Sequence, residues 1–206
     1  MSSFIGHSFA GLTTYAVTTL LQTHRLPQNK RLNWIWLIWL LAIASIPDID
    51  YLIRALRIQQ PDETIRITQS FLGAMLMPVC TILGLWLLGK RGKSFKLQSL
   101  QVVLVGLSHL LLDMLTGVST LPLLYPFSLQ TFKLPFGLLP SAGRIRLTNY
   151  FFYRNIFIEL GVLIPLSISL LLIVRSATKS GNRLLVIAAG FVVSVCFTIW
   201  AFTLSR

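Results

Sequence analysis

The chain has 206 residues, of which 54% are hydrophobic and only 12% are charged, and its mean hydropathy is +0.74. A soluble domain carries about twice this share of charged residues. The composition therefore excludes an ordinary soluble domain and predicts an integral membrane protein made of helices. A formal net charge of +12 is typical of nucleic-acid binding in a soluble protein. Here the Lys and Arg residues cluster in short segments between apolar runs, where they orient a membrane protein, so we expect membrane lipids and no nucleic acid as partners.

Six candidate helices follow one another, at about residues 4–22, 32–46, 69–89, 99–115, 151–174 and 184–204. About 20 helical residues cross a hydrocarbon core. The first helix is rich in Thr and contains His7, so it either spans the membrane or lies in the interface. Pro47 ends the second, because proline lacks the N–H and clashes inside a helix. The predicted fold class is all-α, a polytopic transmembrane bundle of five to six helices.

The stretch 116–150 contains four prolines and no helical pattern. A loop of this length is more often functional than accidental. We expect it to fold back onto one end of the bundle.

The charged residues divide between the two ends of the predicted bundle. The three connections that follow the first, third and fifth helices hold ten basic residues and no acidic residue, whereas the opposite side holds all six acidic residues. The positive-inside rule places the basic connections in the cytoplasm and the N-terminus outside, provided that the first helix spans. This predicts a bacterial-type plasma membrane protein whose acidic side is exoplasmic.

This topology brings unusual polar residues to the exoplasmic end. His7 opens the first helix, Asp48 and Asp50 follow the second, and His109 and Asp113 close the fourth. A spacing of four residues places His109 and Asp113 on one helix face, one turn apart. Histidines and carboxylates that converge from several helices are what a metal site in a bundle requires.

A second pair, Asn155 and Glu159, repeats this spacing at the start of the fifth helix. Each pattern also has a structural reading: an interhelical hydrogen bond for His109 and Asp113, a cap for the Asp-Ile-Asp segment, packing for His7, and a polar seam for Asn155 and Glu159. The location of all six carboxylates and two of the three histidines on one side favours the metal site.

With these residues in view, the chain resembles the YdjM-like family of membrane-bound metal-dependent hydrolases. The resemblance lies in the order of "GHSFAG", "PDID", "RITQS", "SHLLLDMLT" and "GVSTLPLLYPFS". It covers about residues 1–175, which we predict to be a hydrolase-like domain. Residues 176–206 are then a basic loop and an additional C-terminal helix.

The family is similar to zinc-dependent phospholipases C and single-strand nucleases, helical enzymes with clustered zinc ions. The resemblance implies a divalent metal cofactor, zinc first, and the departure described in the next paragraph makes Mg²⁺ or Mn²⁺ the alternatives. It also implies a set of ligands in this chain, drawn from His7, Asp48 or Asp50, His109 and Asp113.

One segment departs from the family pattern. Typical members carry His-Arg-x-x-Thr-His before the third helix, where this chain has "TIRITQS" with Thr64 and Gln69 at the histidine positions and Arg66 displaced by one. A carboxamide is a poor zinc ligand beside imidazole or carboxylate. The departure implies fewer ions, weaker binding, a metal that prefers oxygen ligands, or a loss of catalysis.

The expected chemistry is metal-assisted hydrolysis of a phosphoester or lipid-linked substrate at the membrane face. Asp50 is a ligand or the general base, and Glu159 is the second candidate catalytic carboxylate. Arg66, Arg144 and Arg146 are candidates to hold a phosphate, because guanidinium pairs bidentately with such anions. Arg144 and Arg146 are equally explained as interfacial anchors.

Two other classes of function compete with the hydrolase. In an inactive membrane scaffold, the polar cluster is a structural hydrogen-bond network or a metal site that holds helix ends together, and Gln69 favours this reading. A transporter is disfavoured, because the polar residues gather at one face and not near the midplane.

Overall fold

The computed structural model describes residues 2–23, 33–51, 53–59, 64–117, 120–141, 148–175 and 181–204. Within these residues the chain is all-α, which confirms the predicted fold class. The α-helices are α1 (Phe4–Thr23), α2 (Trp34–Ser45), α3 (Phe71–Leu87), α4 (Gly92–Leu115), α5 (Tyr150–Val174) and α6 (Gly181–Thr203). Three short 3₁₀ helices, η1 (Ile46–Tyr51), η2 (Arg54–Leu56) and η3 (Ile67–Gln69), and one hairpin of β1 (Arg57–Gln59) and β2 (Thr64–Arg66) join α2 to α3.

Three helices among the described residues are long and apolar enough to cross a membrane, namely α4, α5 and residues Asn182–Thr203 of α6. The helix α3 is apolar but shorter. The helix α1 has 20 residues, which extend about 30 Å at about 1.5 Å per residue, and it packs against α2, α4 and α5. The molecule is therefore a helical membrane protein.

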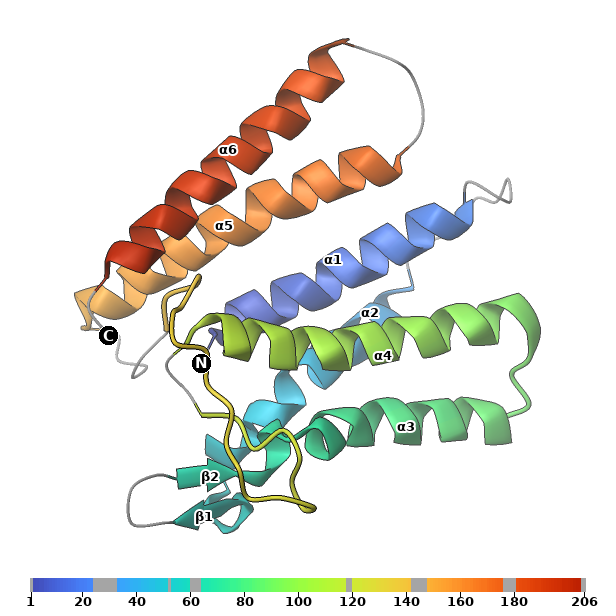
Figure 1. The fold of residues 1–206 in the computed structure, drawn as a ribbon. Coiled ribbons are helices and arrows are strands. Elements are labelled where there is room, and N and C mark those ends of the chain that lie inside the picture. Colours follow the sequence, from blue (N-terminus) through green and yellow to red (C-terminus); the bar gives the residue numbers. More distant parts are fainter. Residues whose placement is uncertain are drawn as a thin grey trace.

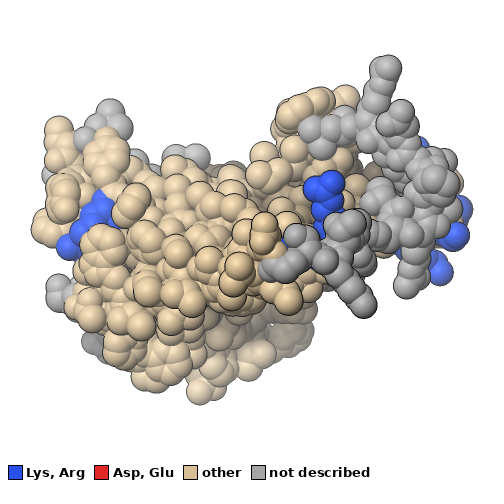
Figure 2. All heavy atoms as spheres, turned by 90° about the horizontal axis from the view of Figure 1, so that it is seen from above, with Lys and Arg blue, Asp and Glu red and all other residues tan. Residues whose placement is uncertain are grey.

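The helices run between two ends of the molecule (Figure 1). One end of the molecule holds the last turns of α1, α3 and α5 and the first turns of α2, α4 and α6. The hairpin and both ends of the described chain lie at the opposite end. Seen from above, a broad band without charged side chains separates two groups of Lys and Arg, and no Asp or Glu is visible on this face (Figure 2). This separation is what a membrane-embedded surface requires, because a charged side chain in hydrocarbon is costly.

Capping residues define where two of the helices begin. The side chain of Asn33 accepts a hydrogen bond from the Trp36 N–H, and that of Ser70 accepts one from the Gly73 N–H, so each satisfies a donor that a helix start leaves unpaired. The helix α2 ends at Ser45, and Pro47 then lies in η1, as the sequence predicts. The tighter turn of η1 carries Asp48 and Asp50.

Two elements differ from the expectation. The helix α4 begins at Gly92 and not near residue 99, because Lys93 and Lys96 are good helix formers, and apolar composition marks the membrane-embedded part of a helix and not its whole length. The hairpin was not expected. Its strands have three residues each, too few for a recognisable alternation.

The loop after α4 folds against one end of the bundle, as expected. Its described part, residues 120–141, contains no helix and is held by a bridge between Leu121 and Phe132. The Phe71 N–H at the start of α3 donates to Leu123 O (3.1 Å), and the Leu139 N–H donates to Leu115 O at the end of α4 (3.0 Å).

The core between α2 and α4 sets the position of the polar residues. It consists of Leu40, Ile43, Ala44, Val102 and Val105, all at most 1% exposed. Because this core holds the C-terminal half of α2 against α4, η1 emerges beside the last turns of α4.

Candidate metal centre

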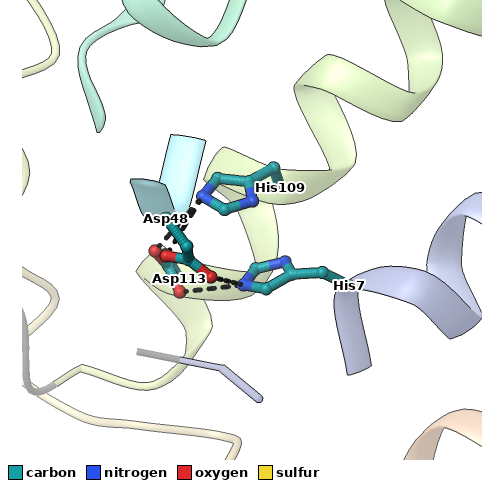
Figure 3. A group of neighbouring side chains, drawn as sticks. All are labelled: His7, Asp48, His109 and Asp113. Carbon is teal, nitrogen blue, oxygen red and sulfur yellow. Dashed lines mark ion pairs between the residues drawn. The ribbon is translucent and has the colours of Figure 1, made fainter. Parts of the chain in front are cut away.

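Four of the predicted site residues converge at the end of the bundle that carries the hairpin (Figure 3). His7 comes from α1, Asp48 from η1, and His109 and Asp113 from α4. One possible ligand atom of each lies within 4.8 Å of the others. The four side chains are at most 3% exposed, so the group is buried in the protein and not spread over its surface.

The distances between these atoms suit a single metal ion. His7 Nε2 lies 3.4 Å from Asp113 Oδ1 and 3.7 Å from Asp48 Oδ2. His109 Nε2 lies 3.6 Å from Asp113 Oδ2 and 3.9 Å from Asp48 Oδ1. Ligand atoms at about 2.0–2.1 Å from a tetrahedral zinc ion are about 3.3–3.4 Å apart. Each carboxylate thus offers one oxygen to each imidazole, at distances slightly longer than those between the ligand atoms of one zinc ion.

The orientation of His109 also fits a metal ligand. Its Nδ1 lies 2.7 Å from the carbonyl oxygen of Ala44, and this contact requires Nδ1 to carry the proton and donate it. The lone pair of Nε2 then faces the carboxylates. A ligating histidine usually donates its other ring N–H in this way. The His7 ring stacks on the His109 ring with centroids 4.0 Å apart, which aligns both Nε2 atoms with the two carboxylates (Figure 3).

Several atoms that face this point are buried without a hydrogen-bond partner. They are His7 Nε2, His109 Nε2 and Asp113 Oδ2. A buried polar atom without a partner costs free energy and calls for an explanation such as an ion. A divalent cation among the four residues satisfies all three atoms together, so the donor set fits a metal.

Gln69, which stands where the family resemblance places a histidine, contacts a member of the cluster. Its side chain is fully buried, and Nε2 donates a hydrogen bond to Asp48 Oδ1 (3.3 Å). The carboxamide thus orients a candidate ligand. Burial raises the pKa of Asp48 to about 7, although the charge of His7 acts against this.

Asp50 lies next to the cluster but is not one of the four. Its side chain is fully buried, and Arg66 Nε is 3.8 Å from Asp50 Oδ2. Arg57 Nε donates to the backbone carbonyl of Asp50 (2.6 Å). Burial raises the pKa of Asp50, while the charges of Arg66 and then of Arg57 lower it.

Glu159 joins the site through the start of the chain. Its carboxylate accepts hydrogen bonds from the Ser2 hydroxyl and from the Ser3 N–H, the latter at 3.1 Å. The Ser2 N–H in turn donates to Asp113 Oδ1 (2.8 Å). Asn155 does not join the cluster, because its Nδ2 donates to the carbonyl of Ser141 (2.6 Å).

Arg144 and Arg146 lie outside the described residues. Sequence reasoning missed Ala44, which acts through its backbone and has no side-chain signal, and also missed Ser2 and Ser3. It missed Arg57 as well, whose partner across the hairpin is Arg66.

Comparison with known proteins agrees with the resemblance seen in the motifs. No curated protein and no solved structure matches the chain. The family model described as YdjM inner membrane protein matches residues 1–204, a range that includes the four clustered residues and the spanning helices. The chain is therefore an integral membrane protein that belongs to the YdjM inner membrane protein family.

Proposed function

We propose that His7, Asp48, His109 and Asp113 bind one divalent metal ion and that the protein is a membrane-bound hydrolase. The observation that carries the proposal is the convergence of their buried ligand atoms, three of them without any hydrogen-bond partner. Two imidazoles and two carboxylates favour zinc, with Mg²⁺ or Mn²⁺ as alternatives.

When bound, such an ion lowers the pKa of water and polarises the scissile group. Asp50 is the proposed general base, because its buried carboxylate is two residues from Asp48 and outside the ligand set. Arg66, and with it Arg144 and Arg146, are proposed to hold the anionic part of the substrate. Glu159 stays a proposed site residue, and its contacts to Ser2 and Ser3 favour a role in positioning.

The proposed substrate is a phosphoester or lipid-linked compound. The cluster lies at one end of the helices (Figure 1), and the positive-inside rule places that end on the exoplasmic side. An apolar cavity of about 740 Å³ is lined by side chains of α1, α4 and the 120–141 loop, among them Leu111, Met114 and Leu124. Such a surface suits an acyl or prenyl chain, which supports a substrate carried in the membrane.

The alternative is a scaffold in which the cluster only joins helix ends. Complete burial favours it, because structural metal sites are closed and catalytic sites keep an open position. The chain contains one clear structural network for comparison: the side chain of Gln101 accepts from Trp36 Nε1 (2.7 Å) and donates to Thr18 Oγ1 (3.0 Å). The side-chain atoms of Gln101 are satisfied within the protein, whereas three atoms of the four-residue cluster have no hydrogen-bond partner, namely His7 Nε2, His109 Nε2 and Asp113 Oδ2. This difference favours an ion over a hydrogen-bond network.

The first test is elemental analysis of the detergent-purified protein, native against the double variant His109→Ala, Asp113→Asn. We expect close to one zinc or manganese per chain in the native protein and none in the variant. The variant Gln101→Leu is the matched control, because it removes a buried polar group from the same helix and is expected to keep the metal. Native protein that holds no metal after loading would refute the proposal.

The variant Asp113→Asn, measured in the metal-loaded protein, distinguishes the hydrolase from the scaffold. In an enzyme, this variant loses hydrolysis of phospholipid and phosphoester substrates while the fold survives. In a scaffold, it lowers the thermal stability, and no substrate is turned over even by the native protein.

A further inference from the structure

The hairpin between η2 and η3 places two arginines side by side. The strands β1 and β2 are antiparallel, and Arg57 is paired with Arg66. Side chains that lie directly opposite in an antiparallel pair leave the same face of the sheet, with Cβ atoms about 4.5–5.5 Å apart. Two guanidinium groups therefore share one face of a very small sheet.

Both guanidinium groups are directed at the same residue. Arg57 Nε donates to the Asp50 carbonyl (2.6 Å), and Arg66 Nε lies 3.8 Å from Asp50 Oδ2. The Asp50 side chain is fully buried, whereas the Arg66 side chain is 22% exposed and Arg57 is half-buried. The arginine pair thus lies at the boundary between the buried site and its surroundings.

Two short connections place this pair beside the candidate metal centre. Asp50 is two residues after Asp48, so their Cα atoms are at most about 7 Å apart. In addition, Arg66 leads directly into η3, where Gln69 donates to Asp48. The segment that carries Arg66 therefore also contacts the candidate metal ligand Asp48, and Arg57 contacts Asp50, two residues after that ligand.

The chemistry of two guanidinium groups selects the ligand. Arginine presents five N–H donors in a planar fork that matches the oxygens of a phosphoryl group. A hydrogen bond from Arg57 Nε to the Asp50 carbonyl and an ion pair of Arg66 Nε with the Asp50 carboxylate hold the two groups. Two like charges that face one another across a hairpin favour a further anion beside them.

We propose that Arg57 and Arg66 form a phosphoryl-binding subsite beside the four-residue cluster and that the substrate is therefore a phosphoester. The inference rests on the proposed function, because it assigns the substrate class of the same site. Arg57 is the residue it adds. The phosphoryl group belongs either to a lipid headgroup or to a soluble phosphoester.

The test measures phosphoryl binding by the full-length, zinc-loaded protein and its variants Arg57→Gln and Arg66→Gln. One arm titrates glycerol phosphate into the detergent-solubilised protein by calorimetry. The other arm places the protein in phosphatidylcholine nanodiscs with phosphatidic acid and measures, by native mass spectrometry, which lipid stays bound. Zinc content is measured in every sample. Arg154→Gln is the matched control, because Arg154 lies on α5 over the Phe151 ring (5.0 Å) and not at the hairpin.

We expect each hairpin variant to weaken phosphoryl binding about tenfold or more, with unchanged zinc content, and Arg154→Gln to bind like the native protein. Binding confined to glycerol phosphate or to phosphatidic acid identifies the source of the phosphoryl group. Native affinity in Arg57→Gln, or no binding of either probe by the native protein, would overturn the inference.

Two further outcomes separate the subsite from the metal site. If the native protein binds the probes through Arg57 and Arg66 but holds no metal, the subsite stands and the proposed function fails. If Arg57→Gln loses its zinc, the variant Arg57→Lys is measured instead. Lysine keeps the positive charge and a donor to Asp50, but it lacks the planar guanidinium that matches a phosphoryl group. Weakened phosphoryl binding with zinc retained then supports the subsite, and unchanged binding overturns it.

Discussion

Asp48 lies between an imidazole and a carboxamide, and this position explains how a glutamine takes part in the candidate metal centre. One oxygen of Asp48 faces His109 Nε2 and also accepts from Gln69 Nε2, and the other faces His7 Nε2. Gln69 therefore restrains the carboxylate of Asp48 by a hydrogen bond. Groups that do not bind a metal themselves often orient its ligands in this way. In the proposed metal site, Gln69 is thus a supporting group at the position where the family resemblance implies a ligand.

At the residue scale, we predict that Gln69→Leu lowers zinc affinity about ten- to a hundredfold while the number of ions bound stays the same. Leucine has a similar size but donates no hydrogen bond, so Asp48 loses one of its restraints. Competition with a chromophoric chelator measures the affinity. An affinity equal to that of the native protein would show that the Gln69 contact does not support the site.

At the scale of an element, the start of α1 depends on a carboxylate from α5. The Ser3 hydroxyl accepts from the Gly6 N–H (2.9 Å), and the Ser3 carbonyl accepts from the His7 N–H (3.0 Å). Glu159 binds the Ser2 hydroxyl and the Ser3 N–H. The first turn of α1, and with it His7, is thus held in place by α5.

Gly6 gives a direct test of this arrangement. A Cβ atom at this position would lie 2.7 Å from Glu159 Cδ and 2.8 Å from Ser2 Oγ. We predict that Gly6→Ala displaces the first turn of α1, destabilises the protein by about 1–3 kcal/mol and lowers the zinc content. Thermal unfolding in detergent and elemental analysis are the measurements.

The control for Gly6→Ala is Gly84→Ala in α3. Apart from the adjacent residues and the backbone of α3 itself, no heavy atom lies within 4 Å of a Cβ atom built at Gly84, and alanine is the better helix former by about 1 kcal/mol. This variant should be at least as stable as the native protein and keep its metal. Equal behaviour of the two alanine variants would contradict the proposed dependence of His7 on Glu159.

At the scale of the whole molecule, the helices separate a basic end from the end that holds the cluster. Lys90, Arg91, Lys93 and Lys96 lie at or near the turn between α3 and α4, and the hairpin and the described part of the long loop lie at the opposite end (Figure 1). We propose that the basic end is cytoplasmic.

The division of the chain near residue 175 also stays a prediction. The helix α6 packs closely on α5, where the Ser194 hydroxyl donates a hydrogen bond to the Val162 carbonyl (2.8 Å).

The orientation can be tested with single cysteines in a background in which Cys80 and Cys196 are replaced by alanine. A membrane-impermeant thiol reagent added to intact cells should label Gln130→Cys and leave Lys93→Cys unlabelled. Both positions are exposed, so access across the membrane is the only intended difference. After the cells are permeabilised, both should react. The reverse pattern in intact cells would place the cluster on the cytoplasmic side.

The sequence alone determined the class of the molecule and most of its helices. Long apolar runs, Pro47 after α2 and the spacing of His109 and Asp113 are local properties, and local properties suffice to place helices and the faces of a helix. The order of short motifs likewise indicated the family, which the family match then confirmed.

Only the tertiary structure decided which polar residues meet. His7 and Asp48 are 41 positions apart in the chain, and they face one another because α1, α2 and α4 pack together. The backbone contact of Ala44 with His109 and the opposition of Arg57 and Arg66 have no sequence signal, since one uses a carbonyl group and the other depends on the register of a three-residue strand pair. Helix periodicity is local, but the site depends on packing between segments that are distant in the chain. The same packing directs Asn155 to the Ser141 carbonyl and not to the cluster.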